Sequence, residues 1–283
     1  MRFCHIAPTF YLPLLADYDY HLCLAHLVER DTTYAQWYAN LTRKLPHYLD
    51  KRSKTIILDN SAFELYKEGK PMYPTERLIR LGNDIKADYI VMSDYPNKDP
   101  QKTIDAAKQF APKLRNAGFG TFFCPQSKIG DLAGLVDSIA WAAVSDHVDY
   151  IGISILAVPN AYGVEKDNKL QRFCSRWKFL RLLEQKGLLD LIVRNGKKIH
   201  MLGMVDGPNE IELVSSFLPY ITSWDSSAAV WAGLNDILFD NSPTGLIEGK
   251  YEVPVDFNFK SAKNTAFAVK NMQYIDGLIM KGI

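Results

Sequence analysis

The stretch TIILDNSAFELYKEGKPMYPTERLIRLGNDIKADYIVMSDYP, residues 55–96, sets the pattern of the whole chain. An apolar run, Thr55–Asp59, is followed by a helical segment that opens at Pro74-Thr75-Glu76, and then by a second apolar run, Asp88–Ser93. Short β-branched runs separated by a helix-length segment are typical of parallel strands joined by a crossover helix. The stretch therefore predicts a strand–helix–strand unit of an α/β fold.

Runs of this kind recur along the chain, and eight can be counted. They are Arg2–Ala7, His21–Val28, Thr55–Asp59, Asp88–Ser93, Gly120–Cys124, Asp149–Ser154, Lys198–Gly203 and Ile221–Asp225. Further helices are predicted to open at Asp99-Pro100 and Pro208-Asn209-Glu210, since proline is tolerated in the first helical turn. A closing helix is expected over about 261–281, and long loops over 158–168 and 241–255. Eight such units predict a single (β/α)8 TIM-barrel domain, residues 1–283.

Composition excludes few classes of function. The 283 residues carry 33 basic and 32 acidic side chains, so net charge indicates neither a nucleic-acid binder nor a membrane-surface protein. The four cysteines stand far apart, and no signal-peptide pattern or membrane-spanning apolar run is present. We therefore expect a soluble cytoplasmic protein with reduced thiols.

Polar side chains follow several of the predicted strands. Asp59, Asp94 and Asp225 each stand at the end of a run, and Gln126 follows another. A single aspartate in this position is most often a turn former or a helix N-cap. Three carboxylates that converge on one barrel mouth repel one another unless a proton or ligand relieves them, so their combination favours a functional site.

The order and spacing of these residues resemble the motifs of the guanine transglycosylases, barrel enzymes that exchange guanine for a 7-deazaguanine in tRNA or, in phage and bacterial relatives, in DNA. The matching motifs, between about residues 54 and 235, are Asp59-Asn60-Ser61-Ala62-Phe63-Glu64, Asp94, Gln126, Gly152, Leu202-Gly203 and Trp224-Asp225-Ser226-Ser227-Ala228. The opening Met1–Pro8 and the compact length look closest to the phage-type DNA 7-deazaguanine transglycosylases. That resemblance implies a cytoplasmic pentosyltransferase, which acts in the host cytoplasm if the chain is encoded by a phage.

The resemblance also implies roles for individual residues. Asp225 would be the nucleophile and Asp59 the general acid/base, as in a retaining glycosidase. The base would be held by Phe63, Asp94, Gln126, the backbone at Gly152, and Asn60. The family usually has Ser-Gly after the first aspartate and Gln after the aromatic residue, whereas this chain has Asn60-Ser61 and Glu64. These replacements affect the expected sugar and phosphate contacts rather than the two carboxylate roles.

The family's tRNA enzymes carry a structural zinc site near the C-terminus, built from clustered thiolates and a histidine. This chain has no cysteine after Cys174, and residues 236–283 are too few for a zinc subdomain. The resemblance therefore implies a barrel without metal or cofactor, and it favours DNA over tRNA. The six histidines lack metal-ligand spacing, and His200 is expected to be packed, or to contact a catalytic residue from behind, rather than to be catalytic itself.

Phosphate contacts are expected from the basic residues after the sixth strand, although a solvated helix face would look the same. These residues are Lys166, Lys169, Arg172, Arg176, Lys178 and Arg181. The leading hypothesis is a DNA guanine transglycosylase that uses 7-cyano-7-deazaguanine or a close relative. The alternatives are the same reaction on tRNA, a non-catalytic barrel that binds DNA or a partner, and a generic barrel glycosidase. The glycosidase alternative leaves Asp94, Gln126 and Gly152 unexplained.

Overall fold

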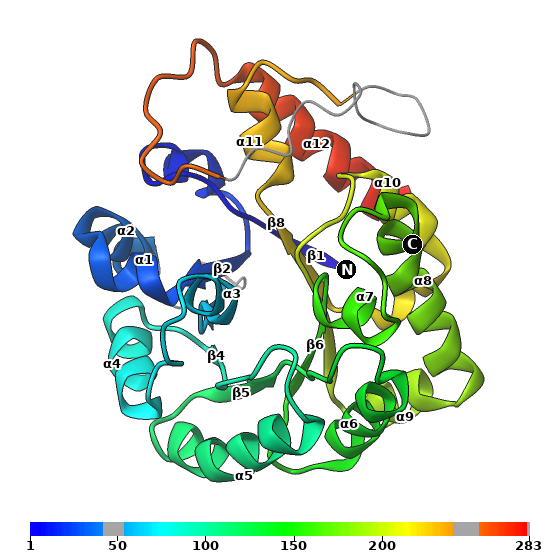
Figure 1. Ribbon diagram of the computed structural model, residues 1–283. Coiled ribbons are helices and arrows are strands. Elements are labelled where there is room, and N and C mark those ends of the chain that lie inside the picture. Colours follow the sequence, from blue (N-terminus) through cyan, green and yellow to red (C-terminus); the bar gives the residue numbers. More distant parts are fainter. Residues whose placement is uncertain (42–53, 240–254, 282–283) are drawn as a thin grey trace.

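The computed structural model describes residues 1–41, 54–239 and 255–281 (Figure 1). Eight parallel strands form the centre, in the order β1-β8-β7-β6-β5-β4-β3-β2. The strands are β1 (Arg2–His5), β2 (Tyr20–Leu24), β3 (Thr55–Asp59), β4 (Tyr89–Val91), β5 (Gly120–Phe123), β6 (Tyr150–Ser154), β7 (Lys198–Leu202) and β8 (Ser223–Ser226). The outer strands β1 and β2 lie against each other and nearly close the sheet into a barrel. The predicted (β/α)8 barrel is thus confirmed.

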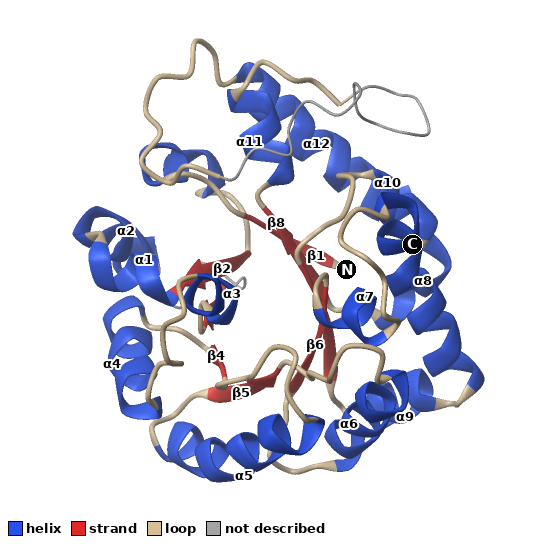
Figure 2. Cartoon of the chain, viewed as in Figure 1, coloured by secondary structure: helices blue, strands red, loops and turns tan. Residues whose placement is uncertain are grey.

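Helices surround the strands, most of them as an outer ring, and two short ones lie inside that ring close to the strands (Figure 2). They are α1 (Ala25–Arg30), α2 (Thr32–Leu41), α3 (Ala62–Lys67), α4 (Thr75–Ile85), α5 (Pro100–Asn116), α6 (Leu132–Val144), α7 (Ala157–Ala161), α8 (Lys169–Gln185), α9 (Leu188–Arg194), α10 (Asn209–Leu213), α11 (Ala228–Leu234) and α12 (Ala266–Lys281), with 3-10 turns η1 (Thr9–Leu15) and η2 (Ser215–Tyr220). The predicted helix starts at residues 75, 100 and 209 are confirmed.

Local sequence explains how these elements begin and pack. Ile56, Ile57 and Leu58 are fully buried, as expected for a parallel strand covered on both faces. The Asp99 side chain caps α5 by accepting a hydrogen bond of 3.0 Å from the backbone N–H of Gln101. In these two examples a run of buried apolar residues marks the strand β3, and a capping side chain marks the start of the helix α5.

Three sequence expectations need correction. The run His21–Val28 is a strand only as far as Leu24, and Ala25–Arg30 forms α1. All of Ala25–Val28 is buried, and a continuous apolar run does not distinguish a strand from a buried helix. The expected loop 158–168 contains most of α7. Just before this helix, the Ser154 hydroxyl accepts a hydrogen bond of 3.1 Å from the backbone N–H of Leu156. The closing helix starts at residue 266 rather than 261, and residues 241–254 of the second expected loop lie outside the described residues.

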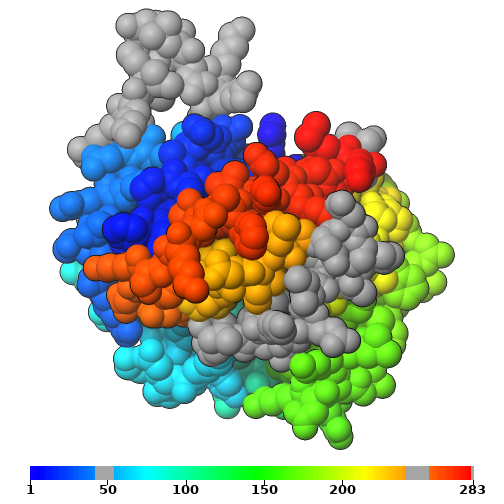
Figure 3. Space-filling model, turned by 90° about the horizontal axis from the view of Figure 1, so that it is seen from above, coloured from blue at the N-terminus to red at the C-terminus, as the bar shows by residue number. Residues whose placement is uncertain are grey.

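The N-terminal part of the chain (blue) and its C-terminal part (orange to red) lie side by side at the surface (Figure 3). The backbone N–H of Thr9 donates to the carbonyl of Phe257 at 3.1 Å, and the Tyr18 hydroxyl donates to Asp276 at 2.9 Å. Helix α12 also packs on α11 and β1. Through these contacts, the segment from Phe257 to the end of α12 packs against the first residues of the chain, although the two are far apart in the sequence. In the described part of the chain, no helix is both long and apolar enough to cross a membrane.

Candidate active site

Aspartates occur at both ends of the barrel and have different surroundings. At the amino end, Asp88 accepts the N–H of Ile56 at 2.7 Å and Asp149 accepts the N–H of Thr121 at 2.7 Å. These two carboxylates therefore pair with the backbone of a neighbouring strand and have a structural role. Asp59, Asp94 and Asp225 instead stand at the carboxyl ends of β3, β4 and β8, where the loops of a TIM barrel build its active site.

The Asp59 carboxyl is the most perturbed acid of this group. Burial raises its pKa well above the usual range, and the charge of Glu64 raises it further. Asp225 and Asp94 act in the same direction, whereas the hydrogen bond of 2.7 Å from the Ser61 N–H opposes them. The three predicted carboxylates therefore share one electrostatic environment, and Asp59 is the one that holds a proton most readily.

Glu64 is a fourth carboxyl of the site, and sequence reasoning gave it no role. It lies in the first turn of α3, and burial raises its pKa, opposed in part by Lys67. Its charge is the largest charge effect on Asp59. The signal that could have found it is its position five residues after Asp59, about one helical turn into α3.

Ser61 occupies the position where the resembled family has glycine. Its φ is 56°, in the left-handed region that non-glycine residues seldom adopt. The hydroxyl Oγ accepts the backbone N–H of His26 at 3.1 Å and lies 2.9 Å from the His26 ring atom Nδ1. The serine therefore gains two contacts to α1 that glycine would lack, and these offset the strain of the turn that aims Asp59.

Asn60, Asp94 and Gln126 form one hydrogen-bonded group, although they come from three different loops. The amide of Asn60 donates to Asp94 Oδ1 at 2.8 Å, and the amide of Gln126 donates to Asp94 Oδ2. All three side chains are buried. Burial raises the pKa of Asp94, and the two amide hydrogen bonds lower it. Each carboxylate oxygen has a second lone pair, so Asp94 can still accept hydrogen bonds from a planar ligand.

Asp225 is held by one of its two oxygens. Its Oδ1 lies 2.9 Å from Nε2 of His200 and accepts the backbone N–H of Gly203 at 3.1 Å. Among the residues that the structure describes, Oδ2 has no hydrogen-bond partner. The side chain keeps 8% of its surface exposed. One oxygen is thus anchored by β7 and its following turn, while the other is left available at the barrel mouth.

His200 is packed inside the barrel, as the sequence predicted, and its position against Asp225 is new. Its ring is fully buried, and Nδ1 lies 2.7 Å from the hydroxyl of Ser223. That hydroxyl lies 3.4 Å from the Tyr150 hydroxyl. A chain of three polar side chains therefore extends from Asp225 into the barrel interior.

Arg176 does not contact solvent, which contradicts its predicted role in phosphate binding. Its side chain is fully buried and forms an ion pair with Glu210, which is also buried. The guanidinium also donates to the carbonyls of Leu202 at 2.9 Å and Gly203 at 2.8 Å. Arg176 therefore supports the turn whose N–H binds Asp225. The sequence shows that Arg176 is charged, but it does not show that Glu210, 34 positions later, neutralises that charge.

The other basic residues predicted to bind nucleic acid are at the surface. Lys166, Lys169 and Lys178 are exposed, Arg172 is half-buried, and Arg181 pairs with Glu184. Lys166 to Arg172 lie near the start of α8, at the same barrel end as the aspartates, because the helix runs back antiparallel to the strands. Lys178 and Arg181 lie further along α8, toward the opposite end. The surface that could meet phosphates is thus limited to the first turn of α8 and the residues before it.

Phe63 and Gly152 were both predicted to contact the bound nucleobase, and they lie in different environments. Phe63 is 39% exposed on α3, and the Lys67 ammonium lies 3.9 Å from its ring centroid. Gly152 is buried in β6, where a Cβ atom would approach Phe122 to 2.6 Å and Leu202 to 2.7 Å. A side chain at residue 152 is therefore excluded by the protein's own packing. The Phe63 ring, by contrast, is open to a ligand.

The loops around this end are joined to one another. The Asn97 amide donates to the Tyr66 hydroxyl of α3 at 3.3 Å, and the Asn160 amide of α7 donates to Asn97 at 2.8 Å. Tyr66 is 49% exposed. The rim beside Phe63 is thus a hydrogen-bonded surface with two accessible aromatic rings.

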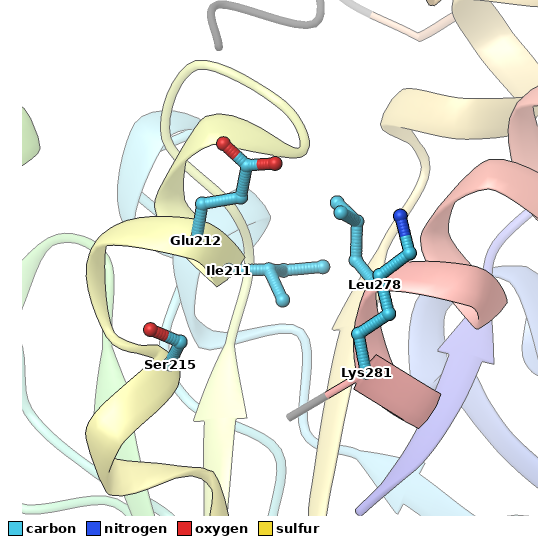
Figure 4. A pocket seen from close by; sticks show the side chains of 5 residues that line it. All are labelled: Ile211, Glu212, Ser215, Leu278 and Lys281. Atoms are coloured by element: carbon cyan, nitrogen blue, oxygen red, sulfur yellow. The ribbon is translucent and has the colours of Figure 1, made fainter. Parts of the chain in front are cut away.

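Other features do not compete with this site. In residues 1–41, 54–239 and 255–281, no group of three or more histidine, cysteine or acidic side chains is arranged to hold a metal ion. A small pocket lies on the outer surface between the α10–η2 segment and α12 (Figure 4), and is lined by Ile211, Glu212, Ser215, Leu278 and Lys281. None of the predicted site residues lines it.

Comparison with known proteins leaves the geometry as the main guide to function. No protein-family model matches this chain, and no curated protein matches it.

Proposed function

We propose that the protein is a pentosyltransferase that exchanges guanine in DNA for a 7-deazaguanine such as 7-cyano-7-deazaguanine. The observation that carries this proposal is the pairing of two unlike acids at one barrel mouth. Asp59 has a raised pKa, and Asp225 presents one oxygen that no described residue hydrogen-bonds. A proton donor beside a carboxylate nucleophile is the arrangement that cleavage of a glycosidic bond with retention requires.

The first half-reaction breaks the bond between guanine and the sugar. Asp225 Oδ2 attacks the anomeric carbon, the bond from that carbon to guanine N9 breaks, and Asp59 gives its proton to the departing base. The product is an ester between Asp225 and the sugar, which keeps the strand attached. Asp59 is then an ionised carboxylate.

The second half-reaction reverses these events with another base. Asp59 removes the N9 proton from the incoming 7-deazaguanine, and N9 attacks the anomeric carbon as the ester bond to Asp225 breaks. Both aspartates return to their starting protonation states. No electrons are transferred, and the only net change is one base for another.

The buried Asn60–Asp94–Gln126 group is suited to reading the base. Guanine and 7-deazaguanines share an edge with an amino group, a ring N–H and a carbonyl. Asp94 can accept from the two donors, and the second N–H of the Gln126 amide can donate to the carbonyl. Bases without these groups would leave buried polar atoms unpaired, which is costly. A simple glycosidase would have no use for this group.

Access of a base from DNA requires that it leave the helix, as for other enzymes that modify bases. The exposed Phe63 and Tyr66 rings at the rim offer stacking surfaces for such a base or its neighbour. Lys166 and Lys169 at the start of α8 are the candidates for phosphate contact. DNA is favoured over tRNA because Asp59-Asn60-Ser61-Ala62-Phe63-Glu64 resembles most the motif of the DNA-acting relatives.

The test is an exchange assay with isotope-labelled guanine, which requires no knowledge of the natural incoming base. Purified full-length protein is incubated with DNA or tRNA, the polymer is digested, and the nucleosides are analysed by mass spectrometry. We expect label in deoxyguanosine with the wild-type protein and none with Asp225→Asn. Label only in tRNA-derived guanosine would move the substrate to tRNA, and an active Asp225→Asn protein would refute the nucleophile. Binding of DNA without any exchange would favour the non-catalytic barrel.

A further inference from the structure

His200, Ser223 and Tyr150 form the polar chain behind Asp225. Its first member, His200, is placed to support Asp225 without contacting the substrate itself. We propose that His200 is a positioning residue that anchors Asp225 by Oδ1, so that Oδ2 is the oxygen that attacks the sugar. Its effect on exchange rests on the proposed function. The pairing itself can be tested without any activity.

The proton on Nε2 of His200 follows from its partner. A carboxylate can only accept hydrogen bonds, so a ring proton is on Nε2, 2.9 Å from Asp225 Oδ1. Nδ1 lies 2.7 Å from the Ser223 hydroxyl, which can donate to an unprotonated Nδ1 or accept from a protonated one. The Ser223 hydroxyl is also placed to donate to the Tyr150 hydroxyl at 3.4 Å. Asp225 therefore fixes the proton on Nε2, whichever role Nδ1 takes.

The ring itself has little freedom to move. The Phe122 ring packs edge-on against it with centroids 5.4 Å apart, and the Tyr150 ring lies at 6.4 Å. Phe122 in turn stacks on Tyr150. The imidazole is thus fixed by packing as well as by hydrogen bonds, as a preorganised support for a reacting group requires.

The second hydrogen-bond donor to Asp225 Oδ1 is a backbone N–H, that of Gly203. The N–H of Gly203 reaches Asp225 because Gly203 has a φ of 69°, a conformation that glycine adopts without strain. Its carbonyl accepts from Arg176 and from the Trp224 ring N–H at 2.6 Å. Two independent donors therefore meet at one oxygen of Asp225, and His200 is the only side chain among them. This arrangement distinguishes the two carboxylate oxygens before any substrate arrives.

The pairing can be measured by nitrogen NMR on full-length protein with ¹⁵N-labelled histidine. The His200 signals are assigned by their loss in His200→Gln. We expect a protonated Nε2 in the wild-type protein, and a displaced Nε2 resonance in Asp225→Ala. A dominant Nδ1–H tautomer, or His200 signals unchanged in Asp225→Ala, would overturn the proposal.

The consequence for exchange is measured with the labelled-guanine assay. We expect His200→Leu to lower kcat roughly 10–100-fold with little change in KM, as for other residues that orient a reacting group. His200→Gln should recover part of that loss, because the glutamine amide can place a donor near the former Nε2. The matched control is His21→Gln, which replaces another buried histidine. The Nε2 atom of its ring bonds to the Tyr18 carbonyl, and the ring packs against Trp37 and Tyr38 of α2.

The outcomes separate the two proposals. Wild-type kcat in His200→Leu, or a loss confined to KM, would refute the positioning role while exchange itself stands. If the leucine variant does not fold, His200→Met takes its place, since its side chain also has no donor for Asp225 Oδ1; a wild-type kcat in that variant would refute the role. If wild-type protein exchanges no base, the proposed function fails, and the NMR experiment alone decides whether His200 anchors Asp225.

Discussion

The charge of Asp225, at the end of β8, raises the pKa of Asp59, at the end of β3. Residues 166 positions apart in the sequence thus act on each other across the barrel mouth. In the proposed reaction the two carboxyls have different roles, with the anchored Asp225 as the nucleophile and Asp59 as the proton donor. Two carboxyls with different environments can in this way divide acid and nucleophile between them.

The pH dependence of exchange should respond to Glu64. The charge of Glu64 raises the pKa of Asp59, so Glu64→Gln removes that charge and lowers the pKa of Asp59. The acid form of Asp59 is lost as pH rises through its pKa, so the alkaline limb of kcat/KM should move to lower pH. The control is Glu68→Gln, an exposed acid one turn later that pairs with Lys70. A limb that stays in place or moves upward in Glu64→Gln would contradict this account.

Base recognition should depend on Asp94 as an acceptor. Asp94→Asn replaces one acceptor oxygen by an amide that faces the donors of Asn60 and Gln126. Buried donors left without an acceptor cost about 1–3 kcal/mol, so we expect kcat/KM to fall roughly 10–100-fold. The control is Asp105→Asn on the surface of α5, where Asp105 also accepts from a glutamine amide, that of Gln101. Equal activity of the two variants in the guanine-exchange assay would show that Asp94 does not read the base.

The buried ion pair should matter for stability rather than for DNA binding. Arg176→Met leaves the Glu210 carboxylate buried without its partner, and such a loss costs about 3–5 kcal/mol of unfolding free energy. Arg181→Met breaks an exposed pair with Glu184 and should cost at most about 1 kcal/mol. Urea denaturation measures both. Removing both charges with Arg176→Met and Glu210→Leu should cost less than the sum of the single changes, and strict additivity would argue against a charge left unpaired.

Acid should destabilise the fold through His21. Burial lowers the pKa of His21 to about 4, below the usual 6.5, and its buried Nδ1 has no hydrogen-bond partner. Between these values the unfolded chain binds more protons than the folded protein, so stability falls as pH falls from 6.5 toward 4. At pH 5 the loss is about 2 kcal/mol relative to pH 7.5. His21→Gln should reduce the pH dependence in urea denaturation, and an unchanged pH dependence in that variant would contradict this account.

The sequence alone determined the architecture and the placement of the acids. Apolar runs separated by helical segments predict alternating strands and helices, and in parallel strands every residue that ends a run lies at the same end of the sheet. Asp59, Asp94 and Asp225 could therefore be assigned to one mouth from their positions in the chain. These inferences succeed because they depend on local periodicity and on the direction of the chain.

The tertiary structure decided which side chains meet. Only the fold brings His200 to Asp225 and buries Arg176 against Glu210, and only the fold joins Asn60, Asp94 and Gln126. In each case the partners are more than 20 positions apart, so their approach depends on strand order and side-chain direction rather than on neighbouring residues. The charge of an arginine is visible in a sequence, but whether water or a carboxylate surrounds it is settled by packing.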